Sequence, residues 1–86
     1  MASVAEVKAA IDAAVQQVSE GQAAVRVASD KLADAQQSLA AAWDGSGHDA
    51  VGAAQAALAQ AGEDLEACLN ATLAAIEQAQ NYMATL

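Results

Sequence analysis

Large aliphatic residues recur at every seventh position through the first half of the chain. They are Val4, Ile11, Val18, Val25, Leu32 and Leu39. Mostly small residues follow three positions after each of them, at Val7, Ala14, Gly21, Ala28, Ala35 and Ala42. An apolar seam held over six such repeats is typical of a helix that packs along one stripe against another helix. The pattern predicts a helix over about residues 3–42, with small seam residues that let a second helix approach closely.

Ser3 and Glu6 mark the predicted start of this helix. Their spacing is that of a capping box, in which the Ser3 hydroxyl accepts from the N–H of Glu6 and the Glu6 carboxylate reaches the N–H of Ser3. Gly21 lies inside the helical pattern, where glycine costs about 1 kcal/mol relative to alanine. Because no proline or other turn residue flanks it, we interpret Gly21 as a point of close approach between helices rather than as a break.

The second half of the chain has a broader apolar face. At about 100° per residue, one arc of a helical wheel gathers Val51, Ala54, Leu58, Ala61, Leu65, Cys68, Leu69, Thr72, Leu73, Ile76, Ala79 and Met83. The opposite arc holds Asp49, Glu63, Asp64, Glu66, Asn70, Glu77 and Asn81. This predicts an amphipathic helix over about residues 47–84, with Ser46 as its N-cap and a period nearer to 3.6 than to 3.5 residues. Cys68, on the apolar arc, is expected to be a small buried hydrophobic residue.

Between the two helical segments lies a short corner, residues 43–46. Trp43 is the only tryptophan of a chain that has no phenylalanine. Gly45 can take the positive φ with which many helices end. Trp43 either plugs the end of the helix pair or presents its ring to a partner. The whole chain, residues 1–86, is therefore predicted to be one all-α domain, an antiparallel helix-turn-helix hairpin.

A lone two-helix hairpin of this length buries little apolar surface, so its core is small. Two hairpins that pair into a four-helix bundle would bury more of this apolar surface. We therefore expect a homodimer, or a heterodimer with a related small helical hairpin. The residues expected to form the core and dimer stripe are Ile11, Val18, Val25, Leu32, Leu39, Leu58, Leu65, Leu69 and Ile76.

The net charge of −8 narrows the classes of partner. With only Lys8, Arg26 and Lys31 as basic side chains, the chain has no basic patch to neutralise phosphates, so no nucleic acid is expected. The same charge argues against binding to an anionic membrane at neutral pH. The longest uncharged run, residues 50–62, is shorter than the roughly 20 residues that span a bilayer. Charges within the first twelve residues also interrupt the apolar run of a cleaved secretory signal.

The sequence has few residues of the types that catalyse reactions or bind metals. His48 is the only histidine and Cys68 the only cysteine, so neither an internal disulfide nor a cysteine-based zinc site is expected. Ser46, His48 and Asp49 are close in sequence, but neighbours on one turn offer no third orienting group and no pocket. We expect no enzyme activity, no metal and no cofactor.

Trp43-Asp44-Gly45, at the midpoint of two predicted helices, resembles the Trp-X-Gly motif of the WXG family of small type VII secretion substrates. Its flanks, residues 39–50, resemble the early secreted antigenic target branch. The resemblance covers the whole chain in length, helices and motif position. It implies a non-enzymatic type VII (ESX-like) secretion substrate or co-secreted partner, exported as a folded helical dimer by an apparatus with a type VII secretion ATPase. It also implies a protein that is cytoplasmic before export and secreted without a cleaved signal peptide.

The resemblance assigns the export corner to Trp43 and Gly45. In the family this corner lies near a Tyr-x-x-x-acid tail on the other subunit. Tyr82 matches the tyrosine of that tail, but Leu86 stands where the family has an acidic residue. Either the partner supplies the tail, or the chain is truncated, or export is not its role. The alternative function is a cytoplasmic helical adaptor or chaperone for a larger secreted toxin or effector.

Overall fold

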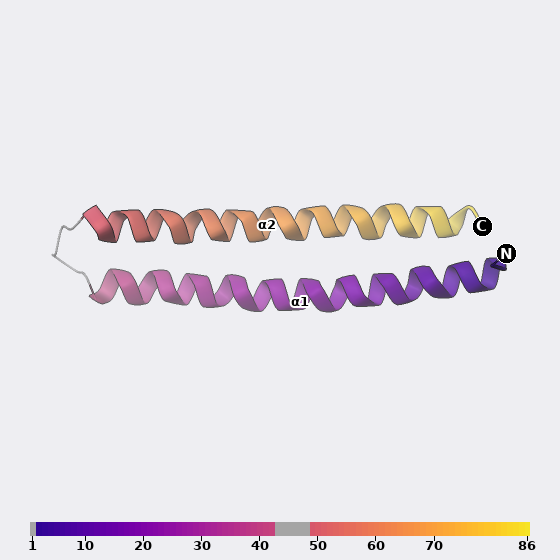
Figure 1. Ribbon diagram of the computed structural model, residues 1–86, viewed down its shortest axis with the longest axis horizontal. Coiled ribbons are helices and arrows are strands. Elements are labelled where there is room, and N and C mark those ends of the chain that lie inside the picture. Colours follow the sequence, from indigo (N-terminus) through magenta and orange to yellow (C-terminus); the bar gives the residue numbers. More distant parts are fainter. Residues whose placement is uncertain (1, 43–48) are drawn as a thin grey trace.

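Two long helices make up the part of the chain that the computed structural model describes, residues 2–42 and 49–86. Helix α1 spans Val4–Ala42 and helix α2 spans Asp49–Ala84. They lie side by side and antiparallel, with the two chain ends at the same end of the rod (Figure 1). The predicted all-α hairpin is confirmed. The predicted corner, with Trp43, Gly45 and Ser46, lies outside the described residues, as does His48.

Ser3 begins α1 through two hydrogen bonds. Its side-chain Oγ accepts from the backbone N–H of Glu6 at 3.1 Å, and its carbonyl oxygen accepts from the backbone N–H of Val7 at 3.0 Å. The first bond is the half of the predicted capping box that satisfies a helix donor otherwise left without a partner. Beyond α2, the N–H groups of Thr85 and Leu86 bond three residues back, to Tyr82 and Met83, which tightens the last turn.

The seam of α1 differs from its predicted position by one residue. Most of its half-buried or buried residues alternate in steps of four and three: Ile11, Val15, Val18, Gln22, Val25, Ser29, Leu32, Gln36 and Leu39. The large aliphatic residues from Ile11 to Leu39 are therefore in the seam, whereas Val4 is 52% exposed, and their main companions follow four positions later rather than three. Of the predicted small stripe, Ala14, Gly21 and Ala42 are exposed, whereas Val7, Ala28 and Ala35 are half-buried. The larger side chains one position on remove more surface from water than alanine would.

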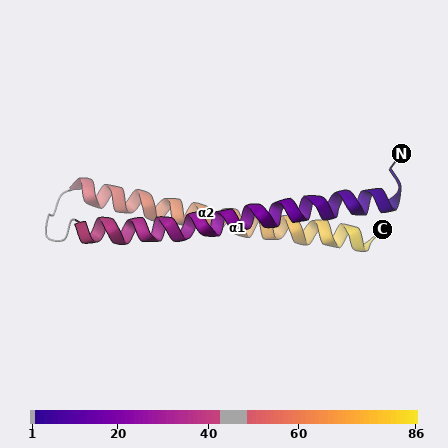
Figure 2. The ribbon, with the colours of Figure 1, turned by 90° about the horizontal axis from the view of Figure 1, so that it is seen from below.

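The seam of α2 follows the same alternation. It consists of Val51, Gln55, Leu58, Gly62, Leu65, Leu69, Thr72, Ile76, Ala79 and Met83, and Ala54 and Ala61 are half-buried beside it. The nine steps from Val51 to Met83 cover 32 residues, a mean of about 3.56, which lies between 3.5 and the expected 3.6. Matched seams of this period keep two helices in contact as they wind around each other, and Figure 2 shows α1 crossing α2 near the middle of the rod.

Two expectations about single residues are corrected. Cys68 is exposed rather than buried, because one neighbouring helix covers a narrower stripe than the apolar arc on which it was placed. Gly21 is not a point of close approach to α2, since a Cβ built on it meets no atom within 4 Å. Both residues lie one position before a seam residue, on the flank of the helix pair.

The hairpin is an open rod. Among the described residues, Gln22 is the only buried side chain, and no hydrophobic side chain is buried. The rod measures 64 × 17 × 15 Å, with a radius of gyration of 19.5 Å. A compact domain of this length would have a radius of about 12 Å. In the described part of the chain, neither helix is long and apolar enough to cross a membrane.

The cap at Ser3 can be tested by removing its hydroxyl. We expect Ser3→Ala to lower the free energy of unfolding by about 1 kcal/mol, because the N–H of Glu6 loses its acceptor. Ser19→Ala, at an exposed position inside α1, is the matched control and should leave that free energy unchanged or slightly raised. Urea titration followed by circular dichroism measures both variants, and equal effects would contradict the cap.

Candidate functional site

The candidate site is a surface of the hairpin rather than a centre of reactive groups. Within residues 2–42 and 49–86, no group of three or more His, Cys, Asp or Glu side chains is placed to hold a metal ion. A hollow of about 210 Å³ lies between the helices. Aliphatic side chains alone line it: Ala14, Val15, Val18, Ala75, Ile76 and Ala79. The hollow therefore offers apolar contact area.

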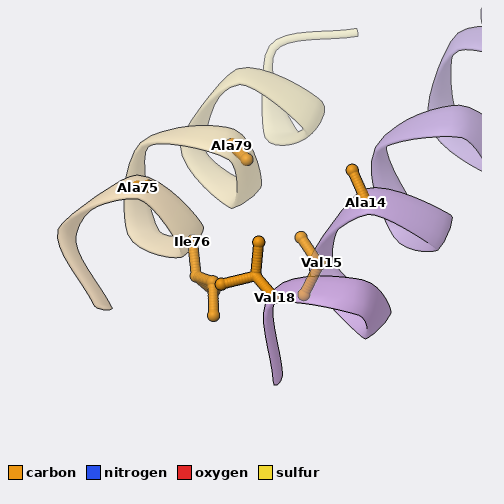
Figure 3. A pocket seen from close by; sticks show the side chains of 6 residues that line it. All are labelled: Ala14, Val15, Val18, Ala75, Ile76 and Ala79. Atoms are coloured by element: carbon orange, nitrogen blue, oxygen red, sulfur yellow. The ribbon is translucent and has the colours of Figure 1, made fainter. Parts of the chain in front are cut away.

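Short side chains leave this hollow open. Val18 of α1 and Ile76 of α2 point toward one another across the seam (Figure 3). The alanines above them end at Cβ and leave the space between the two helices unfilled. An unfilled apolar hollow loses the dispersion contacts that its lining atoms could make. A side chain from another molecule could recover them.

Polar side chains interrupt the seam at its middle. Gln22, 6% exposed, donates from Nε2 to Oγ1 of Thr72 at 3.0 Å. The Thr72 hydroxyl in turn donates to the carbonyl oxygen of Leu69 at 2.8 Å. Each member of this chain of hydrogen bonds is satisfied by the next, so the polar groups are accommodated between the helices.

A second polar link lies nearer to the end of α1. Gln55 donates from Nε2 to the backbone carbonyl oxygen of Gln36 at 2.9 Å. The two links together fix which residues of α1 lie beside which residues of α2. Sequence reasoning missed Gln22, Gln36 and Gln55. The signal that could have found them in α1 is the recurrence of Gln four positions after a large aliphatic residue.

One flank of the seam carries no charged side chain. On α1 it holds Val7, Ala14, Gly21, Ala28, Ala35 and Ala42, and on α2 it holds Ala54, Ala61, Cys68, Ala75 and Tyr82. Each of these residues comes directly before a seam position or, for Val7 and Ala42, continues the same heptad spacing. In an antiparallel pair such positions fall on the same side of both helices. We call this surface the alanine face. The hollow reaches it through Ala14 and Ala75.

The opposite flank has a different character. It carries Asp12, Ser19, Arg26, Glu66, Leu73 and Gln80 among its residues. The small stripe predicted from the sequence forms the α1 half of the alanine face, with Val7, Ala28 and Ala35 half-buried beside the seam. An uncharged surface of small residues permits close approach of further helices, whereas the charged flank favours water.

The predicted site residues lie in three places. The nine residues of the expected stripe lie half-buried along the seam between α1 and α2. Tyr82 lies near the end of α2, on the alanine face, and is 54% exposed. Trp43 and Gly45 lie outside the described residues.

Comparison of the chain with protein families, with curated proteins and with solved structures finds no match.

The polar link in the middle of the seam can be tested with Thr72→Val. We expect this variant to lose about 1–3 kcal/mol of unfolding free energy, because the buried amide of Gln22 loses its acceptor. Adding Gln22→Leu should restore most of the lost unfolding free energy, since it removes the side-chain amide that Thr72→Val leaves without an acceptor. Denaturant unfolding of the single and double variants measures this coupling.

Thr85→Val is the matched control for Thr72→Val. The hydroxyl of Thr85 also bonds to a carbonyl three residues back, that of Tyr82, but it is exposed. Its removal should change the unfolding free energy by less than about 0.5 kcal/mol. A Thr72→Val variant as stable as Thr85→Val would show that the link between Gln22 and Thr72 contributes nothing.

Proposed function

We propose that this chain is a non-enzymatic type VII secretion substrate, or the co-secreted partner of one, exported as a folded helical dimer. One observation supports it above the others: two long antiparallel helices are separated in the sequence by Trp43-Asp44-Gly45. Helix α1 ends at Ala42, so the motif follows it directly. The hairpin and the Trp-X-Gly sequence are the two features that the resemblance to the WXG family brings together.

The open hairpin supports the dimeric part of this proposal. Its accessible surface is 5962 Å², whereas a compact protein of 8.6 kDa exposes about 4,700 Å². The excess is about 1,300 Å² per chain. Permanent complexes bury about 1,000 Å² or more on each partner, so one further hairpin would cover an area of this size. The partner is a second copy or a related small helical hairpin.

The same proposal implies a route of export. The folded pair forms in the cytoplasm, engages a type VII secretion ATPase and leaves the cell without a cleaved signal peptide. Tyr82 is exposed and available to such an apparatus. Leu86 stands four positions after this tyrosine, where the family has an acidic residue, so that residue would have to come from a partner that is a related hairpin and not a second copy.

The export corner is tested with Trp43→Ala. We expect the variant to remain a helical dimer, because the described seam between α1 and α2 is formed by other residues, and to appear in the culture medium at a tenth of the wild-type amount or less. Export is measured by immunoblot of medium and cells in a strain with an intact type VII apparatus. A strain without the ATPase should release none of the wild-type chain.

Val27→Ala is the matched control, since it also truncates an apolar side chain but at a position of α1 that is 55% exposed. It should be exported like the wild type. Wild-type export of Trp43→Ala would contradict the role given to the corner. Retention of the wild-type chain in the cell, bound to a larger secreted client, would instead favour the adaptor or chaperone function.

A further inference from the structure

We propose that the side chain of Tyr82 is a movable lid over the hollow between α1 and α2. The structure shows the lid open: the tyrosine is 54% exposed and does not line the hollow. In the closed position its ring lies across Ala79 and Ala14 and covers the aliphatic side chains beneath them. The inference concerns a single hairpin and depends neither on export nor on a second hairpin.

The first argument is the place of Tyr82 on α2. It stands three positions after Ala79 and seven after Ala75, and both alanines line the hollow. Residues at these spacings lie on the same side of a helix. A long side chain on a helix leans back toward the N-terminus, over the residues three and four positions before it. Helix geometry therefore directs the ring of Tyr82 toward Ala79 and the hollow, not toward the end of the chain.

The second argument is that Tyr82 lies level with the wall of the hollow on α1. The hydrogen bond between Gln22 and Thr72 fixes the alignment of the two antiparallel helices, and it places Ala14 and Tyr82 within about 3 Å of the same level along the rod. Ala14 is exposed and ends at Cβ. The ring therefore meets only a methyl group on that wall when it crosses the gap between the helices.

The third argument is the size and character of the hollow. Its volume is about 210 Å³, and an apolar cavity of about 150 Å³ already holds a benzene molecule. Ala14 and Ala79 face each other across it from the two helices (Figure 3). Its lining is aliphatic, which suits the faces of a phenol ring, while the hydroxyl group at the tip of the side chain stays in water.

The balance of free energies keeps the lid movable. Closure removes apolar surface of both the ring and the hollow from water, and it restores dispersion contacts that the lining atoms lack. The loss of freedom about the two side-chain torsions of tyrosine opposes it. Since only one residue is involved on each side of this balance, the open and closed positions are close in free energy and both are populated.

The lid couples the exposure of Tyr82 to the contents of the hollow. A side chain from another molecule that fills the hollow excludes the closed ring and leaves the tyrosine in water. A closed ring, in turn, bars that side chain from entering. The two events therefore oppose each other to the same extent, as linked equilibria must.

Nuclear magnetic resonance of the alanine methyl groups tests the closed position. The full chain is labelled with carbon-13 at these methyls, and the wild type is compared with Tyr82→Leu, which keeps an apolar side chain but lacks the ring. We expect the methyl resonances of Ala14 and Ala79 to lie upfield in the wild type, because an aromatic ring shields the methyl groups that face it.

Ala61 is the control resonance in these spectra. It is half-buried on the same flank of α2 but lies far from Tyr82, so its position should not change. A ring that stays on α2 would shield Ala79 alone. An Ala14 resonance at the same position in the wild type and in Tyr82→Leu would therefore overturn the lid.

A mixed sample shows which chain supplies the ring. Labelled Tyr82→Leu is equilibrated with an excess of unlabelled wild type, so that only a ring from another chain can shield the labelled methyl groups. We expect the Ala14 resonance of the mixture to match that of Tyr82→Leu alone. If the upfield position returned in the mixture, the ring would act between chains, and a lid within one hairpin would be wrong.

A leucine at position 14 tests the coupling between the hollow and the lid. Ala14→Leu extends a side chain into the hollow and should raise the rate at which tetranitromethane nitrates Tyr82, the only tyrosine, by about threefold or more, because that rate follows the open fraction. Ala13→Leu, at an exposed residue that does not line the hollow, should keep the rate within about twofold of the wild type. The absorbance of nitrotyrosine gives the rates, and circular dichroism checks that both variants remain helical. Equal rates in the two variants would contradict the coupling.

Discussion

Each helix of this protein has only one neighbour in its own chain, and this constraint governs the rest of the structure. A single neighbouring helix covers one stripe, so the aliphatic side chains of the seam stay half-buried, and in the described residues no hydrophobic side chain is fully enclosed. Burial stabilises a fold roughly in proportion to the apolar area removed from water. The hairpin therefore gains less from its seam than a compact domain of the same length gains from its core, and its flanks remain available for a second contact.

Much of the fold follows from the sequence because its determinants are local or periodic. The seven-residue recurrence of large aliphatic residues defines α1, and Ser3 caps it. The rotation of α1 about its own axis could not be predicted in the same way. Three positions after Ile11 and Val18 stand Ala14 and Gly21, whereas four positions after them stand a valine and a glutamine. Pattern reasoning prefers the uniformly small set, but contact with α2 selects the larger side chains and pairs the glutamine with Thr72.

The polar links give the seam a single register. Apolar seams with a heptad repeat tolerate a slip of seven residues, because every heptad resembles the next. In the observed register Gln22 lies beside Thr72, whereas a slip of one heptad would place it beside Leu65 or Ala79, neither of which has a side-chain acceptor. The amide of Gln22, 6% exposed, would then lose its partner at a substantial cost. Two polar residues thus specify an alignment that apolar packing leaves open.

The distribution of large and small residues gives α1 two packing directions. Large residues at every seventh position form the seam with α2, and small residues three positions later form part of the alanine face. A seam of large residues separates helix axes more widely than a surface of alanine does. The alternation of large and small residues therefore separates two roles on one helix: the larger side chains hold the hairpin together, and the alanines form a flank on which the backbone of α1 lies closer to the surface.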